Sequence, residues 1–285
     1  MLGVPLPTVV SDMPDSFFTH DDDWFSPTDH CRGPWDPAAC HAGPPTGLMA
    51  RASEQLVPEQ RLARLTVDLN RPIPFDGFRV EGVIVKGGRT MTTTTLTLVD
   101  RKGKAVVAAR GLHLREQPPV DLPTTPWEPP ELSRSVDGRF PISEGRHPLP
   151  NFTGPGVAVR YPAGNGPDRG PTTLWMRTVA LLPGEEPSPF QRICPLADCG
   201  NAISRNGEPA QYTFVNADIT ILLHRDPSGE WLGSSSISRW ERSGIGISDS
   251  LLFDELGAVG RAFQTLLVTP AARQSTNAAS ESHGT

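Results

Sequence analysis

The sequence predicts an α+β fold made of two tandem copies of one module, in which a helix packs against an antiparallel sheet. Three observations support this prediction. Two segments of alternating hydrophobicity recur at a fixed spacing, a hairpin signal recurs at the same spacing, and a helix signal precedes each segment. A length of 285 residues is enough for two such modules.

The alternating segments cover residues 64–72 and 217–227, and each has an apolar residue at every second position. A period of two is that of a strand with one buried face. Arg71 ends the first segment and Arg225 ends the second, 154 residues later. The same spacing relates Thr66 to Thr220, Leu69 to Leu223, Asp100 to Asp254, Gly103 to Gly257, Leu112 to Leu266 and Leu114 to Val268.

Turn signals divide the end of each copy into strands. The segments Asp100–Gly103 and Asp254–Gly257 each read as a hairpin turn, with the glycine supplying the positive φ that such turns require. Each copy is therefore expected to end in a meander of three antiparallel strands. Further strands are expected around residues 24–25 and 174–182.

A helix is predicted ahead of each meander. The first runs from Gly43 to Leu56 and opens with two prolines, and the second opens at Ser188 and Pro189 and runs to about Asn206. A serine followed by proline is typical of an N-cap and a first helical turn. Pro195 inside the second helix predicts a kink or a late restart, because proline cannot donate the interior hydrogen bond.

These signals divide the chain into four parts. An N-terminal module is expected at residues 15–116, a proline-rich linker at 117–154, a C-terminal module at 155–270 and a disordered polar tail at 271–285. The linker is rich in proline between residues 118 and 130, which favours an extended segment over a third domain.

Composition excludes several classes of protein. Twenty-six Lys and Arg against thirty-two Asp and Glu give a net charge of -6 with no basic cluster, which argues against nucleic-acid binding. The sequence carries neither a secretion signal nor a run of apolar residues long enough for a membrane helix. The four cysteines are too few to stabilise a chain of this size through disulfide bonds. Reduced thiols and a cytoplasmic location are therefore expected.

Six segments together resemble one family. They are residues 41–51 (HAGPPTGLMAR), 65–72 (LTVDLNRP), 188–192 (SPFQR), 196–198 (LAD), 216–225 (NADITILLHR) and 260–268 (GRAFQTLLV). In order and spacing the chain resembles the acyl-CoA thioesterase family that includes bacterial thioesterase II, whose architecture is the double hotdog. The resemblance implies an acyl-CoA substrate, no cofactor, and pairing of double hotdogs into a homo-oligomer.

The resemblance also implies an active site. The family holds a hydrolytic water with an Asp on the second central helix, a hydroxyl or amide residue on the following strand and a Gln on the last strand. These positions fall on Asp198, Asn216 and Gln264. Thioesterase II has a Thr where this chain has Asn216, and a side-chain amide can also orient a water.

The residues around Asp198 give independent reason to single it out. Its neighbours from Pro195 to Ala202 are mostly small and apolar, and a carboxylate there costs several kcal/mol unless it is hydrogen-bonded. One interpretation is a functional carboxylate. The alternative is that Asp198 caps a helix that restarts after Pro195.

The internal repeat allows a comparison of the two copies. At a spacing of 154, the positions of the three candidate residues correspond to Pro44, Leu62 and Arg110 in the first copy. The polar trio is thus expected in the second copy alone. A requirement of the fold would apply to both copies, so this asymmetry favours a functional role over drift between the repeats.

The chemistry suits a thioester, whose carbonyl is electrophilic and whose thiolate leaves readily. A water positioned by Asn216 and Gln264 and activated or anchored by Asp198 can suffice, with backbone N–H groups near a central helix N-terminus polarising the carbonyl. Acyl-CoA hydrolysis to fatty acid and free CoA is the leading hypothesis. No cofactor or metal is needed for it.

Three alternatives stay open. A hotdog enoyl-CoA hydratase would want a histidine beside its aspartate, and the position five residues after Asp198 is Ile203. A non-catalytic acyl-CoA binding module is the second. The third is a metal site made by the residues His30, Cys31, Cys40 and His41, although their spacing matches no standard zinc pattern.

Overall fold

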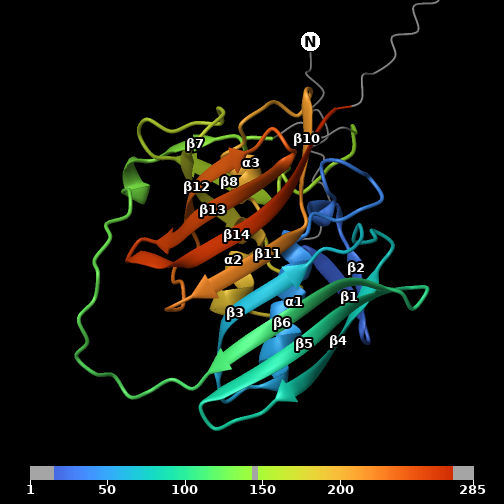
Figure 1. Cartoon of the computed structure of the whole chain (residues 1–285), viewed down its shortest axis with the longest axis vertical. Coiled ribbons are helices and arrows are strands. Elements are labelled where there is room, and N and C mark those ends of the chain that lie inside the picture. Colours follow the sequence, from blue (N-terminus) through green and yellow to red (C-terminus); the bar gives the residue numbers. More distant parts are fainter. Residues whose placement is uncertain (1–15, 143–146, 272–285) are drawn as a thin grey trace, which may run out of the picture.

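The molecule is organised around the pairing of the two repeated strands. In the computed structural model, which describes residues 16–142 and 147–271, β3 (Arg61–Asp68) lies antiparallel to β11 (Asp218–Leu223), and Thr66 is directly opposite Thr220. These two residues are also counterparts in the repeat, so an approximate twofold axis passes between them. The predicted double hotdog, with both halves in one continuous antiparallel sheet, is confirmed (Figure 1).

The strands of each half lie on their own side of this seam. In sheet order the path is β1-β2-β4-β5-β6-β3-β11-β14-β13-β12-β9-β8-β7, with β10 also paired to β14. The remaining strands of the N-terminal half are β1 (Phe18–Asp21), β2 (Trp24–Pro27), β4 (Phe78–Lys86), β5 (Met91–Asp100) and β6 (Ala105–Leu114). Those of the C-terminal half are β8 (Val157–Tyr161), β9 (Thr172–Thr178), β10 (Tyr212–Asn216), β12 (Leu232–Trp240), β13 (Ile245–Asp254) and β14 (Gly257–Pro270).

The predicted meanders and hairpins are confirmed. Their lengths show that the spacing between the two copies changes at one point. Gly103 and Gly257 both adopt positive φ, at 76° and 128°. The Asp100 to Lys104 hairpin is one residue longer than the hairpin from Asp254 to Gly257. The repeat spacing therefore changes from 154 to 153 residues between the strands before and after this hairpin.

This shift corrects one pairing from the sequence. Gln264 lies opposite Ser248, whereas Thr94, the counterpart of Ser248, lies opposite Gly111. The structural counterpart of Gln264 is therefore Gly111. Arg110 was the wrong choice, because its side chain is exposed on the other face of the sheet.

The helices pack side by side on one face of the sheet and run in opposite directions. The predicted helix α1 (Gly43–Leu56) is confirmed, and Ser188 caps α2 (Pro189–Ala197) by accepting a hydrogen bond from Gln191 N at 3.2 Å. Near the end of α1, Glu54 accepts a hydrogen bond of 2.8 Å from Ser188 at the start of α2. The beginning of α1 consequently lies beside the end of α2.

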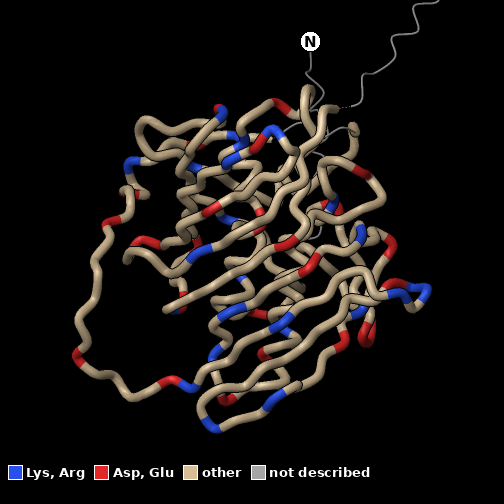
Figure 2. Tube along the Cα trace, in the orientation of Figure 1, with Lys and Arg blue, Asp and Glu red and all other residues tan. Residues whose placement is uncertain are grey.

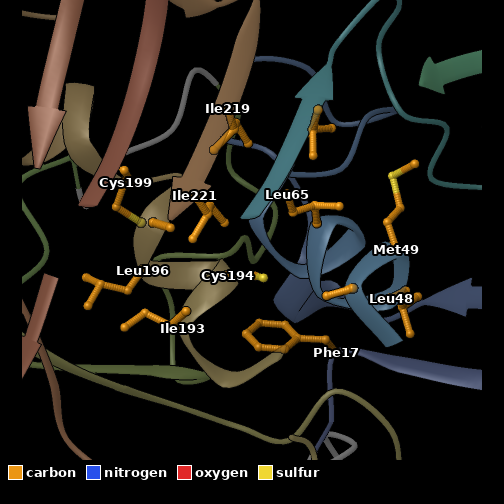
Figure 3. Packing of buried hydrophobic residues seen from close by; sticks show 14 of the residues in the cluster. Phe17, Leu48, Met49, Leu65, Ile193, Cys194, Leu196, Cys199, Ile219 and Ile221 are labelled. Carbon is orange, nitrogen blue, oxygen red and sulfur yellow. The ribbon is translucent and has the colours of Figure 1, made fainter. Parts of the chain in front are cut away.

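One hydrophobic core serves both halves. Leu65 and Ile221 lie opposite each other across the strand seam, and both point toward the helices (Figure 3). Side chains of α1, such as Leu48, and of α2, such as Ile193, close this core from the other side. The two modules are therefore not separable packing units.

The linker crosses from one edge of the molecule to the other. Residues 117–131 form an extended exposed segment, anchored where Trp127 packs against Phe253 at 5.0 Å between ring centroids (Figure 1). A 3-10 turn, Leu132–Arg134, and β7 (Val136–Gly138) follow, and β7 pairs with β8 at the sheet edge. The predicted tail from residue 272 onward lies outside the described residues.

Lys and Arg positions are interspersed with Asp and Glu positions along the chain trace (Figure 2). Among the residues that the structure describes, no helix is long and apolar enough to cross a membrane.

A buried polar cluster fills the space between helix and sheet in the N-terminal half. Ser53 Oγ of α1 lies 2.7 Å from Thr94 Oγ1 of β5 and 2.8 Å from His113 Nε2 of β6, and all three residues are fully buried. Burial lowers the pKa of His113 below its usual 6.5, because the charged imidazolium would lose its hydration. The complete burial of these three side chains suits a structural role.

The lowered pKa of His113 predicts a pH-dependent stability. Below about pH 6.5 the unfolded chain binds a proton that the folded chain resists, so the free energy of unfolding should fall by up to about 1.4 kcal/mol per pH unit. Urea unfolding midpoints of the wild type should drop more between pH 7 and about 5 than those of His113→Gln. Parallel pH dependences in the two proteins would contradict this account, whatever their absolute stabilities.

Candidate functional site

The end of α2 presents Asp198 to the interior. Pro195 cannot donate to the carbonyl four residues earlier, the helix ends at Ala197, and the chain resumes as the short α3 (Gly200–Ile203). Of the two expected outcomes, a kink or a restart, the structure shows the restart. Asp198 lies at the break and is only 4% exposed.

Three side chains from different elements converge on the Asp198 carboxylate. Asn216 Nδ2 donates to Oδ1 at 2.9 Å, Gln264 Nε2 donates to Oδ1 at 3.1 Å, and His41 Nδ1 lies 3.0 Å from Oδ2. The structure therefore brings together Asp198, Asn216 and Gln264 and adds a fourth residue. Asp198 is the C-cap residue of α2, and within the described residues the partners recorded for its carboxylate are these three side chains, with no backbone N–H of α3 among them.

Both the oxygen and the nitrogen of the Gln264 side-chain amide hydrogen-bond to other groups of the protein. Its Nε2 donates to the Asp198 main-chain oxygen at 2.9 Å as well as to Oδ1, and its Oε1 accepts from Asn201 N at 3.0 Å. Both amide hydrogens are thereby used. In this arrangement the amide of Gln264 orients the carboxylate of Asp198.

Gly200 makes this arrangement possible. A Cβ at this position would lie 2.6 Å from Ser248 Oγ and 3.3 Å from Gln264 Oε1. Only glycine lets α3 approach β13 and β14 closely enough for the Asn201 amide to reach Gln264. The position of Gln264 is thus fixed by the backbone of α3.

Asn216 retains hydrogen-bonding capacity. It lies at the end of β10, half-buried, and spends one amide hydrogen on Asp198. Within residues 16–142 and 147–271, no protein partner is recorded for its second amide hydrogen or its oxygen. Asn216 is therefore the amide of the trio that is able to bind a water beside the carboxylate.

His41 comes from the other half of the molecule, just before α1. Its ring stacks on the fully buried Phe152, with centroids 3.9 Å apart and planes 9° apart. Gly43 N–H also points at Nδ1, from 3.2 Å, and Nδ1 can either accept from Gly43 or donate to Asp198 Oδ2, but not both. We assign the proton to Nδ1, because a hydrogen bond to a carboxylate is the stronger of the two. The neutral ring then has an unprotonated Nε2.

From the sequence, His41 was considered only as a member of a possible metal set. A usable signal existed, because two helices related by a twofold axis run antiparallel, which places the start of one beside the end of the other. His41 precedes the first helix and Asp198 ends the second. Their meeting follows from the repeat itself.

The possible metal set is not assembled. Cys31 Sγ donates to Phe17 O at 3.1 Å and Cys40 Sγ to Pro74 O at 3.5 Å, while His41 faces Asp198. In the described part of the chain, no three His, Cys, Asp or Glu side chains gather as metal ligands would.

Two thiols lie next to Asp198 but are poor nucleophiles. Burial, followed by the nearby negative charge of Asp198, raises the pKa of Cys199 well above its usual value, and burial does the same for Cys194. Both thiols stay protonated near neutral pH.

The N-terminus of α1 offers few backbone N–H groups that could polarise a substrate carbonyl. Pro44 and Pro45 have no N–H, so Gly43 supplies the one amide hydrogen of the first three helical residues, and it points at His41. The expectation that several backbone N–H groups gather here is therefore not met at α1.

A cavity of about 320 Å³ opens beside α2. Apolar side chains form much of its wall, namely Phe17, Met176, Leu181, Leu196 and Leu232. Arg177, Arg192, Glu186 and Glu230 add charged groups to the same cavity. Leu196 lines it two residues before Asp198, so the cavity runs along the helix that carries the carboxylate.

The corresponding region of the N-terminal half lacks the polar trio. Asn216 pairs with Leu266 as Leu62 pairs with His113, which supports Leu62 as its counterpart. Pro44 lies in the first turn of α1, whereas Asp198 follows the last turn of α2, so these two are not counterparts. The two helices are therefore not related by the 154-residue spacing that relates the strands of the two copies.

Comparison with known proteins gives a consistent result. Residues 31–114 match the model of the acyl-CoA thioesterase N-terminal domain, and residues 117–268 match that of the acyl-CoA thioesterase C-terminal domain. No curated protein matches the chain.

Solved structures share the fold at low identity. A hot dog fold protein of unknown function from Alicyclobacillus acidocaldarius is 16% identical with a TM-score of 0.66, covering 88% of this chain and 95% of its own. An acyl-CoA thioesterase II, TesB2, from Mycobacterium marinum is 14% identical with a TM-score of 0.59, covering 89% and 94%. The tesB protein of Mycobacterium avium subs paratuberculosis is 14% identical with a TM-score of 0.58, covering 88% and 94%.

The close crossing of α1 and α2 makes a specific prediction about Gly43. A Cβ there would lie 2.8 Å from Pro195 Cα and 3.2 Å from Asp198 Cβ. Gly43→Ala should lower the free energy of unfolding by roughly 1 to 2 kcal/mol, because the clash outweighs the better helix propensity of alanine. Thermal and urea unfolding measure it.

Gly87→Ala is the matched control, since its nearest neighbour would be Ile84 Cγ2 at 3.9 Å. That variant should stay within about 0.5 kcal/mol of the wild type. Equal stability of the Gly43 and Gly87 variants would show that the helices do not need this close approach.

Proposed function

Because the chain belongs to the acyl-CoA thioesterase family, we propose that it hydrolyses fatty acyl-CoA to fatty acid and free CoA at Asp198. The observation that carries the proposal is a nearly inaccessible carboxylate held by three side-chain donors drawn from both halves of the fold. Such a group is expensive to bury and is a candidate functional residue for that reason.

In the proposed reaction a water attacks the thioester carbonyl beside Asp198. Asn216 has the free amide atoms to hold that water, and Gln264 fixes the carboxylate that anchors it. The negative charge of Asp198 stabilises positive charge that develops as the water loses its proton. The acyl chain would lie along the apolar wall of the cavity beside α2, to which Leu196 contributes.

A second candidate is the hydration of an enoyl-CoA, and the contact between His41 and Asp198 favours it. The sequence alone argued against a hydratase because no histidine follows Asp198, yet the other half of the molecule supplies one at 3.0 Å. One assay separates the possibilities. Release of free thiol from saturated acyl-CoA indicates the hydrolase, and loss of enoyl absorbance without thiol release indicates the hydratase. Binding without turnover of either substrate indicates the non-catalytic module.

Self-association is proposed through the outer face of the C-terminal half. Val215, Leu267 and Ile245 lie side by side on β10, β14 and β13, and they are 40%, 56% and 60% exposed. Such an apolar row on a sheet is typical of a face that a second copy covers.

A cytoplasmic location is proposed as well, since the four cysteines are all unpaired.

The trio makes a graded prediction for turnover. Asp198→Asn should lower kcat for thiol release by about 10² to 10⁴, because the side chain keeps its shape and loses its charge. Gln264→Ala and Asn216→Ala should each lower kcat by roughly ten- to a hundredfold through misplacement of the carboxylate or the water. A stably folded Asp198→Asn with near-normal turnover would rule out this site.

Arg110→Ala provides the control for the other half. Arg110 is exposed on β6, the strand equivalent to β14, and it points away from the helices. This variant should keep the wild-type kcat within about twofold, since surface changes are mostly neutral. A loss as large as that of Gln264→Ala would mean that the chemistry is not confined to the C-terminal half.

The apolar row predicts a charge-sensitive oligomer. Leu267→Lys places a cation at the centre of the row, so light scattering should show a shift from dimer toward monomer with unfolding temperature little changed. A wild type that is monomeric at high concentration would refute self-association through this face.

A further inference from the structure

We propose that His41 is a catalytic residue of this site, the base whose Nε2 takes the proton from the attacking water, while Asp198 fixes the ring. This inference rests on the proposed function and assigns the proton transfer to a residue of the N-terminal half. The chemistry would thus require both halves.

The first argument is the hydrogen bonding of Asp198. A carboxylate offers about four acceptor positions. Two of them at Oδ1 receive Asn216 and Gln264, and one at Oδ2 receives His41. Three of the four are therefore occupied by protein donors, which suits an anion that orients its neighbours better than one that must itself accept a proton.

The second argument is the orientation of the imidazole. Phe152 fixes the ring plane by stacking at 3.9 Å, and Asp198 Oδ2 fixes rotation within the plane by holding Nδ1. A histidine held at one nitrogen by a carboxylate presents its other nitrogen as a base. Over the described residues no hydrogen-bond partner is recorded for Nε2, and the His41 side chain is 13% exposed.

Two other described histidines are engaged differently. His113 Nε2 bonds Ser53 inside the core, and His147 Nε2 lies 2.8 Å from Gly33 O. The described histidines thus include one, His41, that joins a buried carboxylate at one nitrogen and keeps the other available. The arrangement is what a proton carrier needs, and a structural histidine does not require it.

The step balances as follows. The water oxygen forms a bond to the thioester carbonyl carbon while its proton moves to Nε2, giving a tetrahedral oxyanion and an imidazolium paired with Asp198. Collapse of the oxyanion re-forms the carbonyl and breaks the C–S bond. The imidazolium returns its proton to the departing CoA sulfur, so the products are fatty acid and thiol with His41 neutral again.

The test is thiol release from a saturating acyl-CoA by His41→Gln and His41→Ala, with unfolding of each variant followed in parallel. Both variants should lose about 10² to 10⁴ in kcat with KM little changed. Added imidazole should restore part of the turnover of His41→Ala, because the space beside Phe152 can admit it. Asp198→Asn should gain nothing from imidazole. His224→Gln, which changes an exposed histidine just after β11, should behave as wild type.

Each outcome decides between a chemical and a structural role. His41→Gln with more than half of the wild-type kcat, beside an inactive Asp198→Asn, would overturn the role of His41 and leave the proposed hydrolase standing. Loss of turnover in His41→Ala that imidazole does not restore in a folded variant would also overturn it. Absence of thiol release by the wild type from every acyl-CoA would instead overturn the proposed function, and this inference with it.

Discussion

The antiparallel pairing of β3 with β11 is the interaction on which the rest of the structure depends. With Thr66 opposite Thr220, the pairing fixes a twofold relation between the halves. That relation forces α1 and α2 to run in opposite directions, so the start of one meets the end of the other. His41 and Asp198 lie at those two ends, and the site is a consequence of the strand register.

Burial of Asp198 is the second constraint. A carboxylate that is 4% exposed would cost several kcal/mol without partners, and three side-chain donors offset that cost. In the other half, where Gly111 replaces Gln264, a neutral cluster of Ser53, Thr94 and His113 fills the space between helix and sheet. A polar interior is thus common to both halves, whereas a buried charge belongs to one.

The strands were predictable from the sequence because their alternation and their spacing of 154 are local properties of the chain. The spacing failed where one hairpin has an extra residue, which made Arg110 the expected counterpart of Gln264 in place of Gly111. The grouping of Asp198, Asn216 and Gln264 followed from family resemblance. The contact of His41 with Asp198 joins residues of the two copies, so it follows from the twofold relation between the helices and is not encoded in any local pattern.

Duplication followed by divergence explains why such a site can form at a junction. Each half alone would expose the apolar residues around Leu65 or Ile221, so packing holds the two halves together. A junction that packing already holds rigid can accept polar residues from either side without losing its geometry. A carboxylate from one half and a ring from the other, fixed by Phe152, is an arrangement that a single module could not provide.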